Sequence, residues 1–158
     1  MKELHFQDLT IKKLDSDSAH ELFQLLQKEN PEYSRYFVPF DFDLETIKQK
    51  LNNLKADTFW GIFVADKIEG FYMLRGFDEG YEIPSYGVWI SKNFTGKGFA
   101  KLTVQHAISY CRVNHIKKLM LKVHPDNLVA KKIYEEFGFQ QSGIDPKNNN
   151  LIYHKLIF

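Results

Sequence analysis

The residues best suited to chemistry lie in a glycine-containing turn between a predicted strand and a predicted helix. The run is YGVWISKNFTGKGFA, from Tyr86 to Ala100. The first N–H groups of a helix lack internal acceptors, and the helix dipole adds partial positive charge there. Glycine would let a bulky anion approach those donors, so the turn suits a pyrophosphate. Taken alone, it fits a plain structural turn equally well.

The turn departs from two other phosphate-binding patterns. A P-loop needs Gly-Lys followed by Ser or Thr, whereas Lys97 is followed by Gly98. The dinucleotide fingerprint needs a third glycine where this chain has Lys101. Neither a P-loop nor a dinucleotide site is therefore predicted.

Two segments together resemble the GCN5-related N-acetyltransferase (GNAT) superfamily. The acyl-CoA signature of that family, Gln/Arg-x-x-Gly-x-Gly/Ala, is matched from Asn93 to Gly98, with asparagine at its first position. Downstream, VHPDNLVAKKIYEEFGF is similar to the second signature: a strand, then Asn127, Ala130, Tyr134 and Gly-Phe. The resemblance covers about residues 59–144 and implies an acetyltransferase that uses acetyl-CoA.

The resemblance also implies roles for particular residues. The strand with Val88 and Ile90 would separate from the next strand, so that its free backbone groups bind the pantetheine arm. Asn127 would cap a helix, which suits asparagine, and would touch the cofactor. Tyr134 would be the general acid that protonates the departing thiolate, although its spacing alone favours a core aromatic. The residues expected to hold the pyrophosphate are Gly96, Lys97, Gly98, Phe99 and Ala100. Asn93 is also expected among the cofactor-binding residues.

The attacking amine must be neutral, so a base must remove its proton. The sequence offers several candidates for this base. Glu82 opens the strand before the glycine turn, where several family members place a catalytic glutamate. An exposed loop glutamate is the alternative. His124 is a second candidate, and a chain of water without a dedicated base is a third. We expect no metal site, because no His, Cys and carboxylate cluster has ligand spacing. Cys111 lies on an inward helical stripe and is expected in the core.

The acceptor amine is expected to bind near an aromatic segment. Five of the ten residues 33–42 are aromatic, and aromatic faces stack on sugars and bind ammonium groups. The alternative is a hydrophobic plug between two helices and the sheet. We favour a small amine such as an amino sugar, with a protein N-terminus or lysine as the competing acceptor. The candidate acceptor-binding residues are Tyr33, Tyr36, Phe37 and Phe40.

Hydrophobic periodicity places these residues in one α/β domain spanning residues 1–158. We expect helices from Ser18 to about Asn30, from near Asp43, from about Gly98 to Asn114, and for about eleven residues after Asn127. A capping box of Ser18 and Glu21 would begin the first helix. The last helix would turn Ala130, Ile133 and Phe137 inward, with Tyr134 at the edge of that stripe and Gly138 as its left-handed C-terminal residue. The expected order is β-α-α-β-β-β-α-β-α-β-β, a GNAT-like mixed sheet flanked by helices. The expected strands are Leu9–Leu14, Phe59–Val64, Ile68–Arg75, Ile83–Ile90, Leu119–Val123, Phe139–Ile144 and Leu151–Ile157.

Composition narrows the function classes. The net charge of +1 argues against a nucleic-acid binder, and no apolar run is long enough to span a membrane. The charge is uneven, however. Residues 1–91 carry a net −6, while residues 92–132 carry nine basic side chains against one acid, which suggests an anionic partner for that part. We expect a soluble cytoplasmic protein and leave open a homodimer and a non-catalytic acyl-CoA-binding module.

Overall fold

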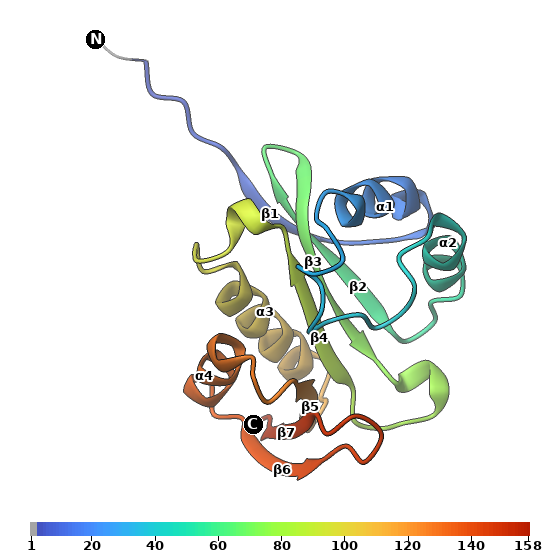
Figure 1. The fold of residues 1–158 in the computed structure, drawn as a ribbon, viewed down its shortest axis with the longest axis vertical. Coiled ribbons are helices and arrows are strands. Elements are labelled where there is room, and N and C mark those ends of the chain that lie inside the picture. Colours follow the sequence, from blue (N-terminus) through green and yellow to red (C-terminus); the bar gives the residue numbers. More distant parts are fainter. Residues whose placement is uncertain (1–2) are drawn as a thin grey trace.

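A seven-stranded mixed sheet forms the centre of the protein (Figure 1). The computed structural model describes residues 3–158. The order of strands and α-helices is the predicted one. The strands are β1 (Leu9–Lys13), β2 (Thr58–Val64), β3 (Lys67–Arg75), β4 (Ser85–Ile90), β5 (Lys118–Val123), β6 (Gln140–Ile144) and β7 (Leu151–Leu156). The helices are α1 (Ala19–Gln27), α2 (Leu44–Asn52), α3 (Phe99–Val113) and α4 (Leu128–Glu136), with single 3-10 turns η1 (Ser16–Ser18), η2 (Phe77–Glu79) and η3 (Lys92–Phe94).

The strands lie side by side in the order β1-β2-β3-β4-β5-β7-β6. Every neighbouring pair is antiparallel except β4 and β5, which are parallel. Parallel neighbours need a long crossover connection, and α3 supplies it. The one parallel pair therefore lies inside the sheet, directly before and after α3.

Helices cover both faces of the sheet (Figure 1). Helices α1 and α2 pack on one face, where Leu22 and Ile47 meet Phe71 and other sheet residues. Helices α3 and α4 pack on the other, where Val104 meets Leu119. Alternate side chains of a strand point to opposite faces, and the central strands β2, β3 and β4 accordingly contribute residues to both cores. Within the described residues, no helix is long and apolar enough to cross a membrane.

The start of the first helix differs from the prediction of a capping box formed by Ser18 and Glu21. The Ser18 hydroxyl accepts the Asp15 N–H at 3.2 Å, and the Asp15 carboxylate accepts the Asp17 N–H at 2.9 Å. Because these contacts cap η1, Ser18 is turned away from α1 and makes no side-chain cap there. Helix α1 also ends at Gln27, before the predicted Asn30.

The last helix is shorter than predicted and rotated. Helix α4 has nine residues and ends before Gly138, which has φ +89° as a left-handed C-terminal glycine should. The predicted inward residues Ala130, Ile133 and Phe137 are only half-buried, whereas Tyr134 is the one buried residue of α4. Tyr134 thus lies at the centre of the inward face instead of at its edge.

Candidate functional site

Strands β4 and β5 separate after a short paired segment. Their register pairs only Ser85 with Met120 and Tyr86 with Leu121. Beyond Tyr86, β4 continues to Ile90 and β5 to Val123 without pairing to each other. The sheet therefore has an opening between its two parallel strands, on the side of the glycine turn.

The free edge of β4 carries unpaired backbone groups. The Ser91 N–H donates to the Glu69 carbonyl, and antiparallel ladders alternate between hydrogen-bonded and non-bonded pairs. The pairs Val88–Tyr72 and Ile90–Gly70 are therefore non-bonded pairs. The N–H and C=O groups of Val88 and Ile90 consequently point away from β3 and toward the opening. This arrangement suits an extended amide-containing chain such as pantetheine.

The glycine turn at the end of β4 has the geometry of an anion cradle. Gly96 and Gly98 have φ of +75° and +85°, which favours glycine. No atom lies within 4 Å of a Cβ built on either residue. Among residues 3–158, none accepts a hydrogen bond from the backbone N–H groups of residues 96–101, and the first helical bond runs from the Leu102 N–H to the Gly98 carbonyl. Six consecutive donors are thus available.

Side chains of the turn are divided between binding and support. The Lys97 ammonium lies 5.0 Å from the centre of the Phe94 ring, and the Lys101 ammonium pairs with Glu136 at 3.2 Å. Phe99 is buried and stacks on Phe94, with ring centres 5.2 Å apart. Phe99 therefore offers only its N–H to a ligand, and the stack fixes the path of the turn. Asn93 and Ala100 lie in the turn as well, the former exposed and the latter half-buried.

Asn127 is the N-cap residue of α4, and it follows β5, the strand across the opening from β4. Its side-chain oxygen accepts the Ala130 N–H at 3.3 Å, which is the helix-capping contact expected of asparagine. The capping role of Asn127 is therefore seen directly. Its side-chain N–H groups make no hydrogen bond to another described residue.

Tyr134 combines a buried ring with an available hydroxyl. The side chain is 8% exposed, and its ring meets Tyr86 and Phe139 edge to face, with centres 6.0 Å apart in both pairs. Its hydroxyl makes no hydrogen bond to the described residues, yet no buried side-chain polar atom there lacks a partner. The hydroxyl must therefore reach accessible space. Burial raises the pKa of the Tyr134 phenol well above its usual range, so it stays protonated near neutral pH.

Tyr86 connects Tyr134 with the glycine turn, and sequence reasoning missed it. The Tyr86 side chain is fully buried at the last paired position of β4, and its hydroxyl lies 2.8 Å from the Thr103 hydroxyl. Thr103 in turn donates to the Ala100 carbonyl at 2.8 Å. Because Thr103 has one hydroxyl proton, Tyr86 is the donor to Thr103. The first turn of α3 is thus bonded to the strand that supports Tyr134.

The two candidate bases lie in different surroundings. Glu82 is exposed, precedes β4 by three residues, and makes no hydrogen bond or ion pair to a described residue. It therefore lies in the connecting loop and does not open the strand as predicted. His124 follows β5 directly, and its Nδ1 accepts the Asp126 N–H at 3.1 Å. The neutral ring must then carry its proton on Nε2, where it can donate but cannot accept a proton.

The aromatic segment is largely packed against the sheet. Phe37 and Phe40 border the core on the α1–α2 face, and Phe40 stacks on Phe59 with centres 6.0 Å apart. A Cβ on Gly87 would lie 2.6 Å from the Phe37 ring, so Phe37 packs directly on β4. Here the structure agrees with the plug alternative.

Two tyrosines of this segment reach the opening. The Tyr33 hydroxyl donates to the Ile90 carbonyl on β4. The Tyr36 ring lies between the Arg35 guanidinium, 4.5 Å from its centre, and the His124 ring, 4.7 Å away. Tyr36 therefore bridges the α1–α2 connection and the end of β5, on the face opposite α3 and α4.

Comparison with known proteins decides the family. A family model described as "Acetyltransferase (GNAT) domain" matches residues 8–140, most of the chain. The protein belongs to the GNAT family. It is 26% identical to an N-acetyltransferase of Bacillus licheniformis named p20, over 91% of this chain and 85% of that one.

Solved structures show the same GNAT fold at low identity. A ribosomal-protein-S5-alanine acetyltransferase from Vibrio fischeri superposes with a TM-score of 0.81 at 16% identity, covering 98% of this chain and 96% of that chain. The PaiA N-acetyltransferase of Thermoplasma acidophilum, solved in complex with coenzyme A, gives 0.75 at 19% identity, covering 94% and 99%. The resemblance inferred from the two signatures is thus confirmed, and the chain is a GNAT-family N-acetyltransferase.

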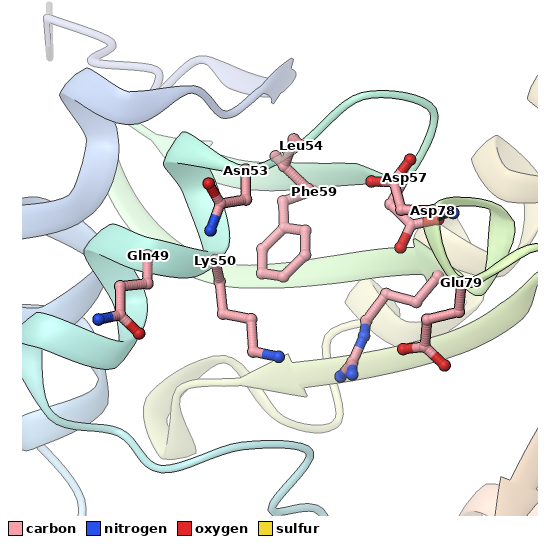
Figure 2. A pocket seen from close by; sticks show the side chains of 9 residues that line it. Gln49, Lys50, Asn53, Leu54, Asp57, Phe59, Asp78 and Glu79 are labelled. Atoms are coloured by element: carbon pink, nitrogen blue, oxygen red, sulfur yellow. Dashed lines mark hydrogen bonds between the residues drawn. The ribbon is translucent and has the colours of Figure 1, made fainter.

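A separate hollow lies at the other end of this GNAT sheet. It is formed by the end of α2, the residues entering β2, and η2 (Figure 2). Figure 2 shows Lys50 on one side and Asp57, Asp78 and Glu79 on the other. Asp78 accepts the Ala56 N–H at 2.7 Å and the Lys55 N–H at 3.1 Å, which lowers its carboxyl pKa. The hollow contains none of the sequence-predicted site residues.

Residues 3–158 contain no group of three His, Cys, Asp or Glu side chains that could hold a metal ion. The one cysteine, Cys111, is fully buried in α3, and burial raises the pKa of its thiol to about 11. The thiol is therefore protonated and out of reach of substrate, as expected of a core residue.

Proposed function

We propose that this GNAT protein transfers an acetyl group from acetyl-CoA to the primary amine of a small molecule. The opening between β4 and β5, which leads into six unpaired N–H groups at residues 96–101, carries this proposal. Acetyl-CoA supplies a thioester whose carbonyl an amine can attack. The residues present fit it, because the opening offers donors and acceptors for amides and the turn offers donors for phosphates.

Each part of the site has a proposed role. Val88 holds the pantetheine arm through its backbone N–H and C=O groups, and Ile90 through its N–H group. The turn binds the pyrophosphate, and Lys97 adds positive charge that the Lys101–Glu136 pair does not supply. Tyr134 protonates the leaving thiolate, since its hydroxyl is free and its raised pKa keeps the proton available.

Proton removal from the amine is assigned to Glu82, acting through water. Its carboxylate is exposed and unpaired among the described residues, so it can accept a proton without breaking an existing contact. His124 is the weaker choice, because its neutral form carries the proton on Nε2. In this scheme His124 and Tyr36 border the path by which the acceptor approaches.

The acceptor class rests on charge. Residues 1–91 carry a net −6, which favours a cationic amine over an anionic one. Tyr36 is the candidate aromatic contact, since Phe37 and Phe40 pack against the sheet. A peptide N-terminus is the second candidate, and it is supported by the fold shared with the S5-alanine acetyltransferase.

An acceptor screen tests the proposed function. The purified protein is incubated with acetyl-CoA and either a panel of amines, amino sugars included, or peptides with free N-termini. Free thiol and acetylated products are then measured, the latter by mass spectrometry. We expect thiol release that depends on an amine from the small-molecule panel. Coenzyme A binding without acetylation of any acceptor would instead identify a non-catalytic binding module.

A further inference from the structure

The junction between β4 and the glycine turn is bonded to the end of α1 and the residues after it. The Tyr33 hydroxyl donates to the Ile90 carbonyl. The Lys92 N–H donates to Glu29 Oε1 at 3.0 Å. Residue 90 is thus held by Tyr33, which sequence reasoning assigned to the acceptor, and residue 92 by Glu29, just after the end of α1.

Ser91 between them is held through a buried carboxylate. The Ser91 hydroxyl donates to Glu69 Oε2 at 2.9 Å, and the Lys28 ammonium lies 3.4 Å from the same carboxylate. Ser91 is 3% and Glu69 8% exposed. A buried carboxylate is costly unless it is paired and hydrogen-bonded. Lys28, the C-cap residue of α1, therefore stabilises the Glu69 carboxylate that accepts the Ser91 hydroxyl.

Together these bonds occupy every polar atom of two consecutive peptide groups. In the Ile90–Ser91 peptide, the carbonyl accepts from Tyr33 and the N–H donates to the Glu69 carbonyl at 2.9 Å. In the Ser91–Lys92 peptide, the carbonyl accepts from the Phe94 N–H at 2.9 Å and the N–H donates to Glu29. The junction is fully bonded, whereas the N–H groups of residues 96–101 that follow it have no acceptor among residues 3–158.

The Tyr33 side chain is itself fixed. Its ring meets Trp89 edge to face at 5.7 Å, and the Trp89 indole N–H donates to the Ser34 hydroxyl at 2.9 Å. The neighbouring residues Tyr33 and Ser34 thus both contact Trp89, while Tyr33 also reaches the Ile90 carbonyl. The Ile90 carbonyl is occupied, so the groups of Val88 and the Ile90 N–H remain for a ligand in the opening.

We propose that Tyr33 and Glu29 are positioning residues for acetyl-CoA. They fix the two peptide groups that orient the Ile90 N–H and the entry to the glycine turn, and Lys28 assists through Glu69. The inference rests on the proposed function, and it transfers Tyr33 from the acceptor side of the reaction to the cofactor side.

Removing the Tyr33 hydroxyl tests the proposal. Tyr33→Phe leaves the Ile90 carbonyl without its partner, and we expect coenzyme A affinity, measured by calorimetry without any acceptor, to fall about three- to tenfold. The KM for acetyl-CoA should rise by a similar factor, with kcat and the acceptor KM nearly unchanged. Tyr81→Phe, at an exposed tyrosine in the loop before β4, is the matched control and should behave as wild type.

Glu29 separates positioning from simple electrostatics. Glu29→Ala removes the acceptor of the Lys92 N–H, so coenzyme A should bind more weakly, and Glu29→Gln should restore binding because an amide oxygen still accepts. If Glu29 acted through its charge alone, both variants should bind coenzyme A more tightly than wild type, because each removes a negative charge near the site of an anion.

The outcomes distinguish this inference from the proposed function. Unchanged coenzyme A affinity in Tyr33→Phe, with a raised acceptor KM, would overturn the inference and return Tyr33 to the acceptor site. A wild-type protein that does not bind coenzyme A would remove the proposed function and the inference with it. Thermal unfolding of each variant shows whether a weaker affinity reflects loss of the fold.

Discussion

The Tyr134 ring lies edge to face against the Tyr86 ring, with their centres 6.0 Å apart and their planes at 81°. Tyr86 occupies the last paired position before β4 and β5 separate, so this contact holds Tyr134 at the closed end of the opening. Through Thr103, the Tyr86 hydroxyl is also bonded to the first turn of α3. The candidate acid and the candidate phosphate cradle are thus supported by one residue.

Tyr134→Phe should lower kcat by about a hundredfold, because general acid catalysis typically contributes at least that much. Coenzyme A affinity should change little, since the ring and its contacts remain. The measurement is steady-state thiol release. Tyr110→Phe is the control, because this tyrosine of α3 contacts Trp60 and has no proposed role in the reaction. An unchanged kcat in Tyr134→Phe would show that another group protonates the thiolate.

The raised pKa of Tyr134 predicts the alkaline side of the rate profile. Because burial disfavours the phenolate, the hydroxyl keeps its proton above the usual tyrosine pKa of about 10. Ionisation of Tyr134 should therefore cause no fall in kcat between neutral pH and about pH 10. A decline near pH 8 that disappears in Tyr134→Phe would contradict this expectation.

Gly98→Ala should weaken coenzyme A binding by about tenfold or more, because the added methyl group would obstruct the N–H groups that bind the phosphates and so remove several hydrogen bonds. A residue with φ +85° also costs about 1 kcal/mol of stability when alanine replaces glycine. Gly80→Ala is a matched control, because Gly80 has φ +93° and equally open surroundings. Equal coenzyme A affinity in the two variants would argue against a phosphate site at the turn.

Gly87→Ala should destabilise the protein by about 1–3 kcal/mol, the usual cost of overpacking, because its Cβ would lie 2.6 Å from the Phe37 ring. Phe37→Leu in the same chain should recover part of that loss. Gly143→Ala, where the nearest atom is 4.0 Å away, is the control for a strand glycine. Urea unfolding gives the free energies, and no loss in Gly87→Ala would mean that Phe37 is free to bind substrate.

Glu82→Gln should lower kcat/KM by about a hundredfold, because the amide cannot accept the proton of the attacking amine. His124→Gln should retain most of the activity, because the neutral ring has no free lone pair on Nε2. Glu79→Gln changes a neighbouring exposed carboxylate and is the control. Normal activity in Glu82→Gln together with a large loss in His124→Gln would reverse the assignment.

Much of the fold followed from local patterns in the chain. Strand alternation and the positions of Asp43 and Gly138 predicted the element order, because helix caps and left-handed glycines are decided by neighbouring residues. The boundaries of α1 were less accurate. There Asp15 and Ser18 cap the preceding turn η1 together, and spacing does not show that Ser18 caps this turn instead of α1.

The backbone conformation of the glycine turn was predictable from the sequence. Glycine favours the left-handed angles found at Gly96 and Gly98, and the first N–H groups of a helix lack internal acceptors. Contacts between distant segments were not predictable, such as the Tyr86–Thr103 bond or the Tyr33 bond to Ile90. Tyr86 shares its alternation with Val88 and Ile90, so its face could be predicted, but its hydrogen-bond partner depends on how α3 lies across the sheet.

The acetyl-CoA site can be tested most directly by following backbone amide resonances of the 15N-labelled protein during titration with acetyl-CoA. The largest shifts should occur at Val88, at Ile90 and at residues 96–101, whose N–H groups have no acceptor in the described part of the chain. Gly98→Ala should reduce these shifts at the same acetyl-CoA concentration. Saturable binding that leaves β4 and the glycine turn unshifted would contradict the assignment of this opening as the acetyl-CoA site.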